Sequence, residues 1–239
     1  QTQQVMKVIQ ENLTSPLSIR AEFCFSVDVP ESHRLVNKEL GGGSILDIGC
    51  YPMSISRHAV GAINGKNFMN PVSIEGQGEL NSQGIDLNAS AKLVFEDGSL
   101  AEVKSATNLS SASDVEISDG KTTIVLNQPW HCGEFTERKS QITLKKSNGD
   151  EESIDITTDK GLYALEIDHF SESLKNHNTE SDLIPHNDSH GNMIALDTWR
   201  KELKVVYDED RGERRQLPII SQNTPRESLP TLNIPGLDK

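Results

Sequence analysis

The sequence predicts an α+β fold, in which one predominantly antiparallel open sheet carries helices on one face. Three observations favour this fold class. Short segments with the alternation typical of strands follow one another from residue 71 to about residue 157. The turns between them contain Glu96-Asp97-Gly98, Asp119-Gly120 and Asn148-Gly149-Asp150, which are typical of hairpin connections. Segments with helical periodicity precede and follow this run, so strands and helices are segregated along the chain.

Three elements precede the run of strands. A helix opens the chain, because apolar residues recur at helical spacing at Val5, Val8, Ile9 and Leu13. A half-buried strand is predicted within residues 17–27, where Ile19, Ala21, Phe23 and Phe25 alternate with other residues. Residues 44–61 are predicted to form a second helix, in which Pro52 predicts a kink or a break.

Seven strands and two helices complete the predicted fold. The strands are expected within residues 71–80, 85–96, 99–108, 114–119, 121–127, 140–147 and 152–158, and the helices at about 161–176 and 188–203. Two of the strands have small and apolar residues on both sides, so we expect the open face of the sheet to pack against another subunit in a homo-oligomer. Residues 1–207 form the predicted domain, and residues 208–239, rich in charge and proline, an extended arm or tail.

The acidic balance of the chain limits its expected partners. With 23 basic and 36 acidic residues, its formal net charge of -13 repels phosphate backbones and anionic lipids. We therefore expect no nucleic-acid partner and no membrane partner. There is neither a long apolar run nor a secretion signal, so a cytoplasmic protein is predicted. Cys24, Cys50 and Cys132 lie far apart, and they predict neither a disulfide framework nor a metal site.

Generic nucleotide-binding and catalytic motifs are missing from the sequence. It contains no G-x-G-x-x-G turn, Walker motif, G-x-S-x-G, H-E-x-x-H or EF-hand loop. Gly41, Gly42 and Gly43 are contiguous and follow a loop, so they do not form a dinucleotide-binding turn between a strand and a helix. These patterns alone predict only an α+β domain.

A resemblance to a known family is carried by HRLVNKELGGGSILDIGCYPMSISRHAVG, residues 33–61. Its G-G-G-x-x-x-D-x-G-x-Y run resembles the second domain of the glucose-fructose oxidoreductase and inositol dehydrogenase (Gfo/Idh/MocA) family. The variant is most similar to the branch of dihydrodiol and xylose-type dehydrogenases. The strand IRAEFCF, the helix YALEIDHFSESLKN and PHNDSHGNMIALDTWR fall in the family's order, so the resemblance covers about residues 1–205.

The resemblance implies a cofactor and a missing partner domain. Members of this family hold NAD or NADP in an N-terminal Rossmann domain, which ends in an E-K-P motif with the catalytic lysine. We expect that domain to be absent from this chain, which starts shortly after the motif. For the second domain, the resemblance implies that Gly42 and Gly43 are candidate cofactor-binding residues, and that the open sheet forms the oligomer interface.

Tyr51 and Asp47 are the candidate catalytic residues. The resemblance implies that Tyr51 is the proton donor or acceptor at the reacting carbon, with Asp47 beside it. The two residues are four positions apart, so they share one side of a helix. A phenol supplies a proton more readily if a nearby cation lowers its pKa from about 10. Alternatively, Ser44-x-x-Asp47 is a capping box, and Tyr51 is part of the core.

Three further residues are candidates for substrate binding, each with a structural alternative. Arg34 lies in a loop that would border the substrate cleft, where it would contact substrate hydroxyls or a cofactor phosphate, or it is solvated. Trp130 could flank a sugar ring or fill a gap between sheet and helix. His169 forms an E-x-x-H pair with Glu166, but no further ligands are evident, so a helix histidine without metal is the favoured interpretation.

The leading hypothesis is the substrate-binding and oligomerisation domain of an NAD(P)-dependent oxidoreductase. Its substrate would be a sugar, a cyclitol or a diol, and the chain alone would be inactive without a turn for the pyrophosphate. Whether the protein is an enzyme depends on the missing Rossmann domain. The alternatives are a non-enzymatic assembly module or pseudoenzyme, and an NAD-dependent glycosidase.

Overall fold

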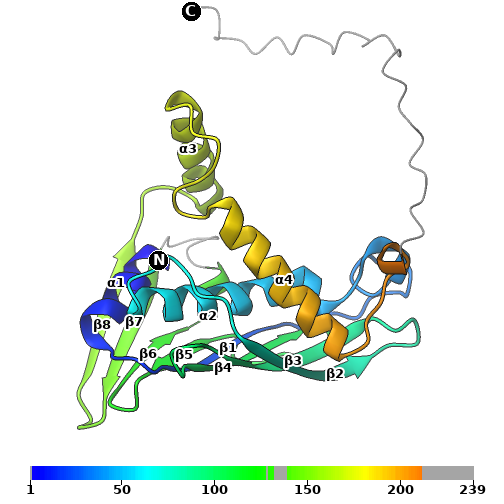
Figure 1. Cartoon of the computed structure of the whole chain (residues 1–239), viewed down its shortest axis with the longest axis horizontal. Coiled ribbons are helices and arrows are strands. Elements are labelled where there is room, and N and C mark those ends of the chain that lie inside the picture. The colour runs from blue at the N-terminus through cyan, green and yellow to red at the C-terminus, as the bar shows by residue number, and fades with distance from the viewer. Residues whose placement is uncertain (1, 128, 132–138, 212–239) are drawn as a thin grey trace, which may run out of the picture. The chain divides into compact units, whose positions relative to one another are not determined.

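A computed structural model describes residues 2–127, 129–131 and 139–211 of the protein (Figure 1). The chain divides into two units, Gln1–Tyr207 and Asp208–Lys239. Of the second unit, the structure describes one short 3₁₀ turn, Asp208–Arg211. The predicted arm beyond it and Cys132 lie outside the described residues, whereas Cys24 and Cys50 are free thiols.

An eight-stranded sheet forms the centre of the first unit, in the order β2-β3-β4-β1-β5-β6-β7-β8 (Figure 1). The strands are β1 (Ser18–Cys24), β2 (Ser73–Leu80), β3 (Asp86–Val94), β4 (Leu100–Ala106), β5 (Val115–Ser118), β6 (Thr122–Leu126), β7 (Lys139–Lys146) and β8 (Glu151–Thr157). Every neighbouring pair is antiparallel except β1 and β4, which are parallel. The predicted α+β fold is confirmed, and the parallel pair is the feature that hairpin signals could not predict.

Three helices cover one face of this sheet: α1 (Thr2–Asn12), α2 (Cys50–Ile63) and α4 (His186–Glu202) (Figure 1). Alternate strand residues such as Ala91, Leu93 and Val103 are buried beneath them. Trp199 of α4 is fully buried and donates its indole N–H to the carbonyl oxygen of Ser90 at 3.1 Å. The core therefore lies between the sheet and this helical layer.

The helix α3 (Leu162–Lys175) leaves its apolar side exposed. It stands clear of the sheet in Figure 1. Tyr163, Ile167, Phe170 and Leu174 recur along one side of it with exposed fractions of 56% to 65%. Helical periodicity predicted the element correctly, but periodicity cannot say what covers its apolar side.

The predicted helix at residues 44–61 consists of two parts. A π-helical turn, Ile45–Gly49, leads directly into α2. Pro52 lies in the first turn of α2. A backbone N–H at that position has no acceptor within the same α-helix, so proline removes no hydrogen bond from α2. The predicted irregularity therefore precedes Pro52, as a change of helix type, and α2 continues to Ile63.

The second face of the sheet carries no helix among the described residues (Figure 1). The residues that point to it from the central strands are mostly polar. On β3, the residues Ala89, Ala91 and Leu93 point to the helices, whereas Ser90 and Lys92 point to the other side. The small apolar residues that suggested an apolar interface thus belong to the core. Within the described part of the chain, no helix has the length and apolarity needed to cross a bilayer.

Candidate active site

A buried carboxylate fixes the start of the helix that carries the candidate catalytic residues. Asp86 Oδ2 accepts hydrogen bonds from the backbone N–H of Ile45 at 2.7 Å and from the hydroxyl of Ser44 at 2.9 Å. Ser44 has helical dihedral angles and makes no capping bond, and Asp47 binds Arg34. The capping-box alternative is therefore wrong: the cap comes from the strand β3, which sequence spacing could not reveal.

Burial raises the pKa of Asp86, although the hydrogen bonds from Ile45 and Ser44 oppose the shift. A raised folded-state pKa means that this group's stabilising contribution is present at low pH and is lost as pH rises through that pKa. We expect the free energy of unfolding of Asp86→Asn to improve relative to the wild type as the pH rises from about 4 to about 8. Urea denaturation at several pH values measures this difference.

Asp97→Asn is the matched control for this experiment. Burial alone would raise the pKa of Asp97, but hydrogen bonds from Asn64, Ser99 and Ser15 lower this pKa below its usual value. The stability that Asp97 contributes is present above its unfolded pKa and is lost as the pH falls, so its variant must show the opposite trend. A pH-independent difference for Asp86→Asn would contradict the assignment.

Gly42 and Gly43 form the turn that leads into this helix, and both are buried. Their N–H groups donate to the carbonyl oxygens of Asn37 and Leu35, at 2.9 and 3.0 Å. The hydroxyl of Tyr207 donates to the carbonyl oxygen of Gly42 at 2.6 Å. A Cβ at Gly43 would lie 2.6 Å from Asp86 Oδ1. These glycines therefore have packing roles, and their N–H groups are not free for a cofactor phosphate.

Tyr51 lies at the edge of a group of aromatic rings. The aromatic cluster consists of Phe23, Phe25, Tyr51 and Trp130. The ring of Tyr51 is edge-on to Phe23 at 5.3 Å and 5.9 Å from Trp130 between centroids, and Trp130 stacks on Phe23 at 5.6 Å. Tyr51 is 47% exposed, so it is not a plain core residue. Its ring is held by packing while the residue remains open to solvent.

The phenol of Tyr51 is surrounded by groups that keep it protonated. Its pKa is raised, first by burial and then by Cys50, Tyr163, Asp47 and Glu166. The sequence-based expectation required a cation to lower this pKa. Among the described residues the balance has the opposite sign, so at neutral pH the phenol of Tyr51 carries its proton.

Asp47 and Arg34 form an ion pair beside Tyr51. Arg34 Nη1 lies 2.7 Å from Asp47 Oδ1, and the side chains are 65% and 24% exposed. An ion pair this exposed contributes little to stability. Its donors and acceptors remain accessible to a ligand, so the structure brings together three of the predicted site residues: Tyr51, Asp47 and Arg34.

Trp130 and His169, the other two predicted substrate-binding residues, lie in different surroundings. Trp130 is half-buried in the aromatic cluster and donates its indole N–H to the carbonyl oxygen of Glu22 at 2.7 Å. It packs against the core and also borders Tyr51, whereas its contact with a sugar ring stays a prediction. His169 Nε2 lies 2.8 Å from the hydroxyl of Ser181, a local partner on the chain after α3. Among the described residues, no group of three or more potential metal ligands is found.

A buried polar network behind Tyr51 was missed by the sequence analysis. Arg57 Nη1 binds Asp188 Oδ1 at 2.7 Å, with both side chains almost inaccessible, and His58 Nε2 lies 3.0 Å from Asp188 Oδ2. Asn192 donates to the carbonyl oxygen of Cys50 at 3.3 Å. These contacts tie α4 to the residue before Tyr51. An arginine and a histidine on an apolar helix are a signal of such a network, but their shared partner Asp188 lies more than a hundred residues away.

Comparison with known proteins identifies a family and a relative that match parts of the chain. Residues 2–125 match the family described as GFO/IDH/MocA C-terminal domain. A trans-1,2-dihydrobenzene-1,2-diol dehydrogenase of Xenopus tropicalis is 39% identical over 77 residues, which cover 32% of this chain and 21% of that protein.

Solved structures share the fold at low sequence identity. An aldose-aldose oxidoreductase from Caulobacter crescentus, complexed with glycerol, has a TM-score of 0.68 at 15% identity over 85% of this chain and 58% of its own. A 3-ketoreductase from Actinomadura kijaniata, in complex with TDP-benzene and NADP, has a TM-score of 0.63 at 16% identity over 84% and 57%. The chain thus spans less than two thirds of the length of these relatives.

Proposed function

Because the chain belongs to the GFO/IDH/MocA family through the C-terminal domain matched by residues 2–125, we propose that it is the substrate domain of an NAD(P)-dependent oxidoreductase. The substrate class is a sugar, a cyclitol or a diol, in line with the names of the aldose and dihydrodiol relatives. Tyr51 is the proposed proton donor in reduction and proton acceptor in oxidation.

The observation that carries the proposal is the exposure of Tyr51 between two kinds of surface. On one side, the aromatic cluster offers apolar faces that suit the C–H groups of a sugar ring. On the other, the pair of Arg34 and Asp47 offers donors and acceptors for hydroxyl groups. A ligand between them would bring a carbonyl or hydroxyl oxygen to the phenol, which burial keeps protonated by raising its pKa.

The cofactor would be held by a part of the enzyme other than the described residues. Gly42 and Gly43, the glycines implied for this role, use their N–H groups within the turn. They therefore do not fit a dinucleotide phosphate. NAD(P) would supply the hydride chemistry, and this domain binds and orients the substrate and moves one proton. On this proposal the chain alone does not turn over, and the full enzyme assembles through the open face of the sheet.

Activity of the protein made from its complete reading frame tests the proposal. With NAD or NADP and a panel of aldoses, cyclitols and diols, we expect net accumulation of reduced cofactor matched by oxidised product. Residues 1–239 alone serve as the control and should produce none. The intact mass of the protein from its source shows which reading frame is natural.

Each other outcome contradicts a stated part of the proposal. Release of an aglycone without net reduced cofactor would replace the dehydrogenase by a glycosidase. A natural protein without a cofactor-binding segment, inactive on the whole panel, would leave an assembly module or pseudoenzyme.

A further inference from the structure

The polar side of the candidate site consists of one cation and one anion in contact. Arg34 Nη1 lies 2.7 Å from Asp47 Oδ1, so the carboxylate balances the charge of the guanidinium. Their hydrogen bond uses one N–H donor of Arg34 and one oxygen of Asp47. Within the described part of the chain, these two side chains make no other hydrogen bond. The pair therefore offers further donors and acceptors to a ligand without a net positive charge.

A second carboxylate acts on the same phenol. Asp47 precedes Tyr51 by four residues, which places the two side chains on one side of the helical segment. Glu166 of α3 is exposed and forms no ion pair with any described residue. Both carboxylates raise the pKa of Tyr51, so both are close enough to act on a group bound at the phenol. Two carboxylates thus face one guanidinium around the site.

The geometry points to Asp47 as a specificity-determining residue: by balancing Arg34, it lets the site bind neighbouring hydroxyl groups of an uncharged substrate and reject carboxylate or phosphate groups. This role rests on the proposed function and narrows its substrate class. A hydroxyl group can accept a hydrogen bond from Arg34 and donate one to Asp47. An ionised carboxylate only accepts, and it meets Asp47 and Glu166 as like charges.

Breaking the ion pair does not favour an anionic ligand. A carboxylate that displaced Asp47 from Arg34 would form one ion pair at the expense of another of the same kind. It would also leave Asp47 without a partner, next to a like charge. A neutral sugar needs no such exchange, and its hydroxyl groups form hydrogen bonds with charged partners, which are stronger than those between neutral groups. The selectivity therefore depends on the charge of Asp47.

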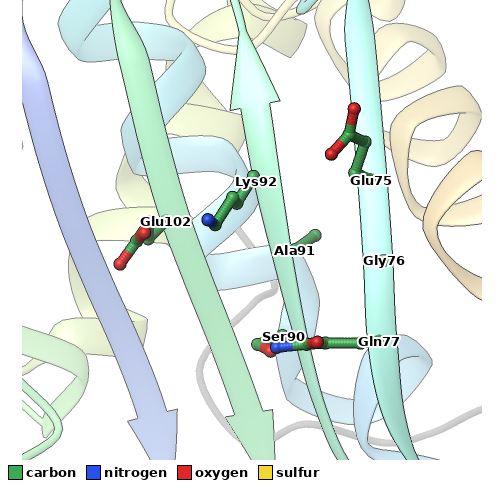
Figure 2. A pocket seen from close by; sticks show the side chains of 7 residues that line it. All are labelled: Glu75, Gly76, Gln77, Ser90, Ala91, Lys92 and Glu102. Atoms are coloured by element: carbon green, nitrogen blue, oxygen red, sulfur yellow. The ribbon is translucent and has the colours of Figure 1, made fainter.

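The sheet carries another place where a ligand could meet charged groups. A hollow of about 370 Å³ lies over β2, β3 and β4, and Figure 2 shows Lys92 between Glu75 and Glu102 there. No aromatic residue is among the described residues that line this hollow. It therefore lacks the apolar faces that the aromatic cluster beside Tyr51 offers to a sugar ring. Its lysine and glutamates provide matched controls for Arg34 and Asp47.

Sugar binding to the protein made from its complete reading frame tests this role. The probes are glucose, galactose and mannose, each compared with its uronate near neutral pH by isothermal titration calorimetry. Reduced cofactor is present, so that the sugar is not oxidised. We expect each neutral sugar that binds to have a dissociation constant at least about tenfold lower than that of its uronate. The difference should shrink at high ionic strength, because salt screens the repulsion between exposed charges.

Variants of the pair should change the selectivity in opposite directions. Asp47→Asn leaves Arg34 unbalanced, so the dissociation constant of the uronate should fall at least about tenfold relative to that of the neutral sugar. Arg34→Met leaves Asp47 without its cation, so the uronate should bind still more weakly relative to the neutral sugar. Glu166→Gln should shift the ratio in the direction of Asp47→Asn, by about threefold, because it removes a like charge from the anionic ligand.

Glu102→Gln and Lys92→Met make matched charge changes in the hollow over the sheet. Each should leave the ratio of the two dissociation constants within about twofold of the wild type, because no part of the aromatic cluster borders that hollow. Circular dichroism verifies that every variant is folded.

The overturning results are distinct from failure of the proposed function. A uronate that binds the wild type as tightly as its neutral sugar would refute the selectivity, and so would an unchanged ratio in Asp47→Asn. A ratio that responds to Lys92→Met or Glu102→Gln instead would assign binding to the hollow. Failure of all three neutral sugars to bind would refute the sugar site itself. By contrast, a protein that binds neutral sugars with the expected selectivity but never oxidises them would refute the proposed reaction alone.

Discussion

Tyr51→Phe is expected to lower kcat of the complete enzyme by about 10²–10⁴-fold, the usual contribution of a positioned acid or base. The free energy of unfolding should change by less than about 0.5 kcal/mol, because the ring contacts with Phe23 and Trp130 persist. Among the described residues, no hydrogen bond is made by its hydroxyl. Steady-state kinetics and urea denaturation measure the two effects.

The other two tyrosines of the chain are the matched controls. Tyr163 is 65% exposed on α3, so Tyr163→Phe should leave stability unchanged. Tyr207 donates to the carbonyl oxygen of Gly42 from a buried position, so Tyr207→Phe should lower stability by about 1 kcal/mol. Unchanged kcat in Tyr51→Phe would exclude this phenol as the proton donor.

Arg57→Met is expected to lower the free energy of unfolding by about 3–5 kcal/mol, because it leaves the carboxylate of Asp188 buried without its arginine. Burial already lowers the pKa of Arg57, and Asp188 opposes that shift, so each charge depends on the other. The double variant Arg57→Met/Asp188→Leu removes both charges, so its free energy of unfolding should fall much less than that of Arg57→Met. Urea denaturation of the single and double variants measures the difference.

The exposed pair of Lys7 and Glu11 is the control. These side chains are 64% and 56% exposed at 3.8 Å, so Lys7→Met should change stability by less than about 0.5 kcal/mol. If Arg57→Met lowered the free energy of unfolding by less than about 0.5 kcal/mol, the buried network would not be what holds α2 to α4.

Local patterns predicted most of the elements. Helical periodicity found α1 through Val5 and Val8, and the hairpin turns placed β3 to β8, because these signals lie within the segment that forms the element. The central position of β1 was not predictable, since its pairing with β4 depends on residues far along the chain. Asp86 was missed for the same reason, because its carboxylate caps a helix that begins some forty residues earlier.

The site was predicted in part. Tyr51, Asp47 and Arg34 lie together as the resemblance implied, because one short segment carries all three. The pKa of Tyr51 is raised by burial and by groups such as Glu166 of α3. The spacing of residues along the sequence could not predict the direction of this shift, because Glu166 lies far from Tyr51 in the chain. The roles of these residues in catalysis and binding remain predictions.

The position of β1 also affects how the chain folds. Ser18 pairs with Leu100 on one side and Ser118 on the other, so the strand that is synthesised first enters the middle of the sheet. While the ribosome makes the segments between them, Ile19 and Phe23 have no sheet to join. Closing so long a loop costs conformational entropy before any contact compensates it, which slows folding and prolongs exposure of apolar surface. A nascent chain that stops before β4 therefore exposes apolar surface of the kind that chaperones bind, and release of β4 and β5 sets the earliest moment at which β1 can pair with its two neighbours.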